Sequence, residues 1–70
     1  MTREQRKIAL ALLTSAAASR DDDARWTRNE ASYLPTRHRG LILGEARDLR
    51  DEAKALRAAA RVLRKVEVTK

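Results

Sequence analysis

Six basic side chains near the carboxyl end recur at alternating steps of three and four residues, a spacing that places them on one side of an α-helix. Basic groups that advance by about 5 Å along a helix axis can each contact a different nucleic-acid phosphate. A solvated helix face is the alternative, because arginine and lysine are good helix formers. We favour phosphate contact because 53–66 contains no carboxylate. The six residues are Arg47, Arg50, Lys54, Arg57, Arg61 and Arg64.

Other basic residues could extend this surface. Arg37 and Arg39 flank His38 at the expected start of a helix, where two guanidinium groups and free backbone N–H groups would hold a phosphate. A solvated basic turn explains these residues equally well. If the first and last helices are antiparallel, the amino-terminal basic residues also lie near the end of the last helix. This extended set adds Lys65, Arg3, Arg6 and Lys7.

The overall charge and the residue types present narrow the function. The chain has 70 residues, a formal net charge of +6 and no cysteine. The positive charge favours a polyanionic partner, and the missing thiols exclude a disulfide framework and a thiolate metal site. One histidine, serines without an evident base and the lack of a glycine-rich phosphate loop argue against catalysis. We therefore expect a protein that is not an enzyme and binds no cofactor and no metal.

Three consecutive aspartates, Asp21, Asp22 and Asp23, interrupt the apolar pattern of the amino-terminal third. They could cap a following helix and face its positive dipole end. A metal site is the alternative, but neighbouring carboxylates point in different directions and no second ligand cluster is visible. The pattern favours capping, which predicts a break between two helices at 20–23.

A seven-residue repeat of small and large apolar residues runs through 46–66 and predicts a packing seam along a helix of residues 37–66. Close antiparallel packing within one chain is our preferred interpretation. A parallel homodimer is the alternative, because the flanking charges would also pair between two copies. The seam consists of Ala46, Ala53 and Ala60 at one position and Leu49, Leu56 and Leu63 at the other.

Residues 3–19 are predicted to form the first helix, with Thr2 and Gln5 as a capping box. Its apolar residues lie all round the helix, which predicts a central element covered on several sides. A secretory signal is the alternative interpretation. Glu4 and the short apolar run 8–13 argue against it, and no segment reaches the ~20 apolar residues that a membrane span requires.

A short second helix is predicted over residues 24–34, ended by Pro35. Trp26 and Tyr33 are seven residues apart and fall on one face of this helix. We expect them to supply core volume, with stacking on nucleobases as the alternative. The fold class is therefore all-α, a three-helix arrangement packed as an antiparallel hairpin or bundle. Residues 1–70 form one small domain, with a frayed tail at 67–70.

These features predict a small, basic, cytoplasmic protein that binds nucleic acid as an accessory or regulatory factor. The alternative is a protein-interaction module, such as a phage-encoded inhibitor or adaptor. It would dock on a host protein or an acidic surface through the Leu/Ala seam or the surface around Trp26 and Tyr33. A helix-turn-helix motif around the Leu34–Arg37 turn is disfavoured because the last helix is long for a recognition helix. A homodimer remains possible.

Overall fold

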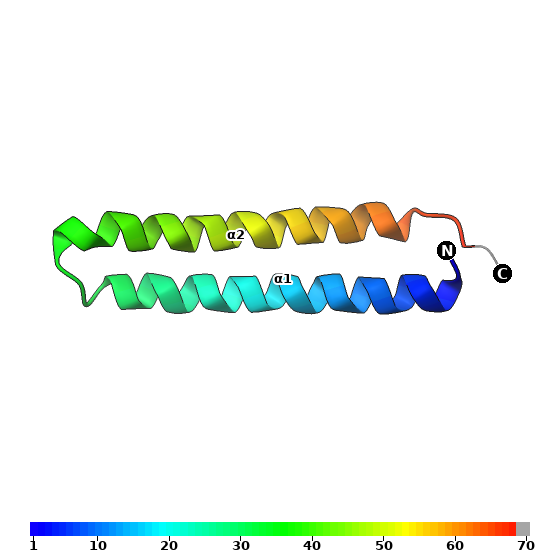
Figure 1. Ribbon diagram of the computed structural model, residues 1–70, viewed down its shortest axis with the longest axis horizontal. Coiled ribbons are helices and arrows are strands. Elements are labelled where there is room, and N and C mark those ends of the chain that lie inside the picture. The colour runs from blue at the N-terminus through cyan, green and yellow to red at the C-terminus, as the bar shows by residue number, and fades with distance from the viewer. Residues whose placement is uncertain (69–70) are drawn as a thin grey trace.

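The computed structural model describes residues 1–68, which form an antiparallel hairpin of two α-helices (Figure 1). Helix α1 spans Arg3–Ala31 and helix α2 spans Thr36–Arg64, each of 29 residues. The two helices lie side by side along their whole length, and the backbone measures 56 × 14 × 10 Å. The turn occupies one end of this rod, and the start of α1 lies beside the end of α2 at the other.

Local hydrogen bonding fixes both ends of α1. The predicted capping box is confirmed: the Gln5 N–H donates to Thr2 Oγ1 at 3.1 Å, and the Thr2 N–H donates to Gln5 Oε1 at 2.9 Å. At the other end, the Leu34 N–H donates to the carbonyl of Ala31 at 3.2 Å. These bonds satisfy backbone groups that a helix end leaves without a partner.

The predicted division of the first half into two helices is wrong, because α1 continues without interruption through residues 20–23. Aspartate costs only about 0.5 kcal/mol in a helix interior, so local preference alone is too weak to break the helix. Contacts with α2 offset that cost: Arg20 pairs with Glu52, and Asp21 pairs with Arg57. The aspartates therefore lie within a helix and cap none.

Pro35 separates the helices as predicted, since it is the residue immediately before α2. Thr36 is the first residue of α2, and no side chain caps this helix start. Arg39 stabilises the turn instead. Its Nε donates to the carbonyl of Leu34 at 3.0 Å, and its Nη2 donates to the carbonyl of Ser32 at 3.5 Å. The turn is thus held by a side chain from the first turn of α2.

Small residues form the centre of the contact between the helices. The buried residues are alanines at seven-residue intervals, and no residue larger than alanine is buried within 1–68. The three seam leucines, Leu49, Leu56 and Leu63, are half-buried. Alanine allows two helix backbones to approach closely but removes little apolar surface from water. The buried set is Ala17, Ala24 and Ala31 on α1 and Ala46, Ala53 and Ala60 on α2.

Two expectations about burial are wrong for the same reason: each helix has one neighbour and keeps an outer side in solvent. The first helix is not a covered central element, since Ile8 is 53% and Leu12 67% exposed. Trp26 and Tyr33 do not supply core volume, being 69% and 88% exposed. Trp26 lies on the outer side of α1 and Tyr33 lies in the turn that follows it, both away from the alanine seam.

Gly40 and Gly44 lie inside the first turns of α2 in ordinary helical conformation, with no neighbouring atom where a Cβ would be added. Glycine in a helix interior costs about 1 kcal/mol relative to alanine. Changing both to alanine is therefore expected to raise the free energy of unfolding by about 1 to 2 kcal/mol. Urea denaturation followed by circular dichroism measures this, and an unchanged or lower midpoint would contradict the regular helix at 36–44.

Candidate nucleic-acid interface

Two ion pairs join α1 and α2 on opposite flanks of the seam. Asp21 and Arg57 meet on one flank, and Arg20 Nε donates to Glu52 Oε2 at 2.8 Å on the other. Residues seven apart share a flank, so Arg28 lies on the flank of Asp21, and Arg50 lies on the flank of Arg57. The ion pairs therefore establish which residues of the two helices share a surface.

Basic side chains gather on the flank marked by Asp21 and Arg57, and we call this surface the basic face. On each helix it includes the residues seven or fourteen positions from Asp21 or Arg57. It also includes the residues three or four positions from any of these. Basic residues of both helices occupy it. They are Lys7, Arg25 and Arg28 on α1 and Arg47, Arg50, Lys54, Arg57, Arg61 and Arg64 on α2.

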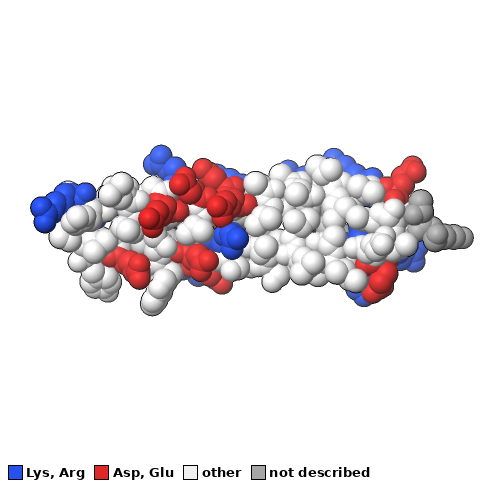
Figure 2. Space-filling model, in the orientation of Figure 1, with Lys and Arg blue, Asp and Glu red and all other residues white. Residues whose placement is uncertain are grey.

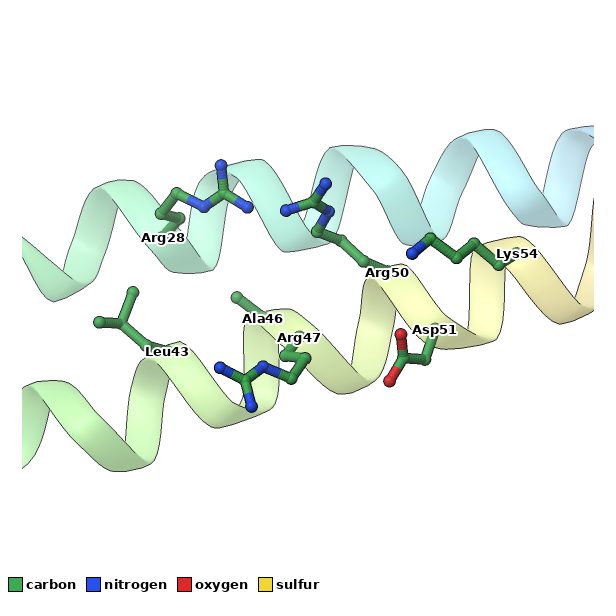
Figure 3. A pocket seen from close by; sticks show the side chains of 7 residues that line it. All are labelled: Arg28, Leu43, Ala46, Arg47, Arg50, Asp51 and Lys54. Atoms are coloured by element: carbon green, nitrogen blue, oxygen red, sulfur yellow. The ribbon is translucent and has the colours of Figure 1, made fainter.

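An open groove of about 470 Å³ lies between the helices on the basic face. Arg28 enters it from α1, and Arg50 and Lys54 enter it from α2 (Figure 3). The Arg28 and Arg50 guanidinium groups point toward one another, and the Lys54 ammonium group points toward Arg50. The remaining lining residues are Leu43, Ala46, Arg47 and Asp51.

The charges in this groove are poorly compensated. Asp51 is the single acid among the lining residues. Arg28, Arg50 and Lys54 form no ion pair with any residue among the described residues 1–68. Neighbouring cations repel one another, and an anion bound between them would relieve that repulsion. The forked donors of arginine are well matched to phosphate oxygens. The groove is therefore suited to a phosphate group.

A smaller hollow, lined by Ala24, Arg25 and Asp21, adjoins the groove and shares Arg28 and Arg50 with it. The Arg57 guanidinium, hydrogen-bonded to Asp21, holds the pKa of that carboxyl below its ordinary value of 3.8. A lowered pKa in the folded state means that this pair stabilises the fold above pH 3.8 and loses its effect as pH falls through the lower value. At neutral pH the pair is intact.

The predicted binding residues divide into those on the basic face and those engaged elsewhere. Arg6 Nη1 donates to the carbonyl of Val66 at 3.0 Å, which joins the helix ends. Arg39 stabilises the turn, and Arg57 neutralises Asp21. Arg37 and Lys65, exposed and 28 residues apart, lie on the outer edge of α2, and Arg3 lies at the first residue of α1. The basic face contains Lys7, Arg47, Arg50, Lys54, Arg61 and Arg64.

Sequence reasoning missed Arg25 and Arg28, the two arginines that α1 contributes to the middle of the basic face. They were assigned to a separate short helix, with no defined relation to the ridge on α2. The signal that could have found them is the spacing of Ala17, Ala24 and Ala31, which continues one seam through the aspartates. A continuous helix then places Arg28 opposite the start of the ridge.

Acidic side chains occupy the other flank, and they gather in the half of the hairpin near the turn (Figure 2). Glu45 and Glu52 are seven apart on α2, and Asp23 and Glu30 are seven apart on α1. The flank that these acids share includes the Arg20–Glu52 ion pair. The hairpin therefore separates most of its charges. The basic face holds most of the cations, with Asp21 and Asp51 among them, and the other flank holds carboxylates with Arg20.

Comparison of the chain with protein-family models, with curated proteins and with solved structures found no match. Within residues 1–68, neither α1 nor α2 has a stretch long and apolar enough to cross a membrane. The same residues hold no group of three or more acidic, histidine or cysteine side chains placed to bind a metal ion.

Proposed function

We propose that this chain is a small non-enzymatic accessory or regulatory protein that binds the phosphate backbone of nucleic acid through its basic face. The observation that carries the proposal is the convergence of Arg28, Arg50 and Lys54 from two helices in one groove. Among residues 1–68 none of these three is neutralised by an ion pair. A cytoplasmic location belongs to the proposal because nucleic acid is accessible there.

The hairpin would present these groups as a rigid row. Helix geometry spaces Arg47, Arg50, Lys54 and Arg61 along the axis, and Arg28 widens the row across the groove. The row can follow successive phosphates, and phosphate contacts by themselves carry no sequence information. Binding is therefore expected to tolerate different sequences and to depend strongly on salt.

A salt titration tests the proposal directly. Fluorescence anisotropy would measure binding to a mixed-sequence duplex and to a single strand between 50 and 300 mM salt. We expect log K to fall with log salt by about 0.9 for each neutralised phosphate on duplex DNA, hence a slope of about −4 to −5 for five contacts. Undetectable binding at 50 mM salt would contradict the proposal.

A second candidate function is docking on a host protein, as a phage-encoded inhibitor or adaptor would do. The specific observation is the exposure of Trp26 and Tyr33, which line a shallow hollow with Asn29, Glu30 and Ser32. Exposed aromatic residues often anchor protein interfaces. The Leu/Ala seam does not serve this role in the hairpin because α1 already covers it.

A further inference from the structure

A continuous apolar surface lies on the flank opposite the basic face, in the half of the hairpin away from the turn. Leu12 on α1 and Val62 on α2 are 67% and 66% exposed, and Val66 lies at the same end. Ala16 and Ala59, on the same flank, lie between them by helix spacing. We call these five residues the apolar patch. Figure 2 shows an uncharged stretch between the acidic half and the charged groups at the far end of the hairpin.

The apolar patch contains no charge. Residues 8–19 of α1 include no acidic or basic side chain. Three of the cations at this level, Arg57, Arg61 and Arg64, lie on the basic face. Lys65, three residues from Val62, lies at the edge of the patch, where its long side chain can keep its ammonium group in water. Most carboxylates of the patch's own flank lie in the other half, toward the turn, and a few acidic groups lie at the far end of the hairpin. A partner can therefore cover this surface without burying an unpaired charge, and burial of an unpaired charge would cost several kcal/mol.

The hairpin alone has a weak core. Its buried residues are alanines, and its seam leucines stay partly exposed. Burying a leucine or valine side chain contributes about 1.5 to 3 kcal/mol, most of which Leu12 and Val62 do not gain in the single hairpin. Covering the patch would therefore stabilise the fold substantially.

We propose that a second copy of this chain covers the apolar patch, giving a symmetric dimer in which α1 packs on α1 and α2 on α2. The twofold axis of this dimer is perpendicular to the long axis of the hairpin and passes at the level of Leu12. It places the apolar patch of one copy on the apolar patch of the other, because each copy supplies the same surface. The two hairpins then point in opposite directions and overlap by about half. The acidic half of each copy extends beyond the other, so the carboxylates stay in water.

Charge selects this arrangement over the parallel one. In a parallel dimer the turn ends would coincide and α1 of one copy would face α2 of the other, which would set Glu30 of one copy against Glu45 of the other. The overlapped half is about 28 Å long and two helices (~20 Å) wide, about 560 Å² in projection and more in accessible area. This is near the ~600 Å² per partner found at the lower limit of specific interfaces, so a dissociation constant in the micromolar range is expected.

Sedimentation equilibrium tests the dimer. The wild-type chain is expected to pass from monomer to dimer between about 1 and 100 μM. Leu12→Glu should shift the midpoint at least tenfold to higher concentration, and Trp26→Glu, which places the same charge outside the patch, should not. A monomeric wild type at 500 μM, or equal effects of the two substitutions, would overturn the proposal. Circular dichroism confirms that both variants remain helical.

The arrangement is tested by a spin label on Tyr33→Cys, which is specific because the natural chain has no cysteine. The 21 residues between Leu12 and Tyr33 place the two labels about 60 Å apart in the antiparallel dimer. The parallel dimer places them within about 25 Å. Pulsed electron paramagnetic resonance distinguishes the two, and the short distance would overturn the proposed arrangement. Neither experiment requires nucleic acid, so failure here is independent of the proposed function.

Discussion

Replacing Ala53 with aspartate is expected to unfold most of the chain at 25 °C. Ala53 is 0% exposed at the centre of the seam, where both helix backbones approach it. An unpaired carboxylate at a buried site costs about 3 to 5 kcal/mol, which matches the ~3 to 5 kcal/mol that a chain of this size has available. Far-ultraviolet circular dichroism at low micromolar concentration would show the loss of helix.

Ala58→Asp is the matched control, because Ala58 is an exposed residue of the same helix. It introduces the same side chain with the same weak helix preference, about 0.5 kcal/mol below alanine or less. The control should keep its helical signal. If both variants unfold to the same extent, burial at the seam is not what makes Ala53 sensitive, and the hairpin packing is wrong.

Changing Arg28, Arg50 and Lys54 to glutamine is expected to weaken nucleic-acid binding by about 10²-fold at 100 mM salt. Each lost phosphate contact reduces the salt slope by about 0.9, so the slope should fall by nearly 3. The fold should be retained, because none of the three side chains is in a cross-helix ion pair between described residues. Anisotropy titrations at several salt concentrations measure both quantities.

The control for this triple variant removes the same number of charges away from the groove, at Arg3, Arg37 and Lys65. These residues are exposed and lie at the helix ends or on the outer edge of α2. We expect a reduction of tenfold or less, because net charge acts at long range and is screened within about 10 Å at this salt concentration. Equal losses in the two variants would mean that total charge, and not the groove, determines binding.

The sequence was sufficient for the features that depend on spacing within one helix. Seven-residue intervals identified Ala46, Ala53 and Ala60 as packing residues, and three- and four-residue steps identified the ridge around Arg50 and Lys54. The predicted helix 37–66 agrees with α2 to within two residues at each end. Such periodicity follows directly from helix geometry, so it needs no knowledge of the neighbouring element.

The features that could not be predicted from the sequence depend on how each helix packs against the other. Asp21 and Arg20 favour a break only when α2 is ignored, since their partners are more than 30 residues away. Trp26 and Tyr33 were expected to supply core volume, as aromatic residues of a small chain often do, and that role needs a neighbouring element to cover them. With two helices there is no such cover, and residues that share a face in the sequence pattern remain in solvent. Arg28 can be assigned to the groove only if α1 is one continuous helix through residues 20–23.

The placement of the turn at one end also determines an order of assembly. Layers next to the turn join residues close in sequence, whereas layers at the far end, such as the bond from Arg6 to Val66, join residues 60 apart. Loop-closure entropy therefore favours pairing that starts at the turn and proceeds outward, and opening that starts at the far end. Hydrogen exchange should be slowest near the turn. The apolar patch with Leu12 and Val62 lies near this far end. A second copy bound to the patch would therefore stabilise the helix ends that separate first.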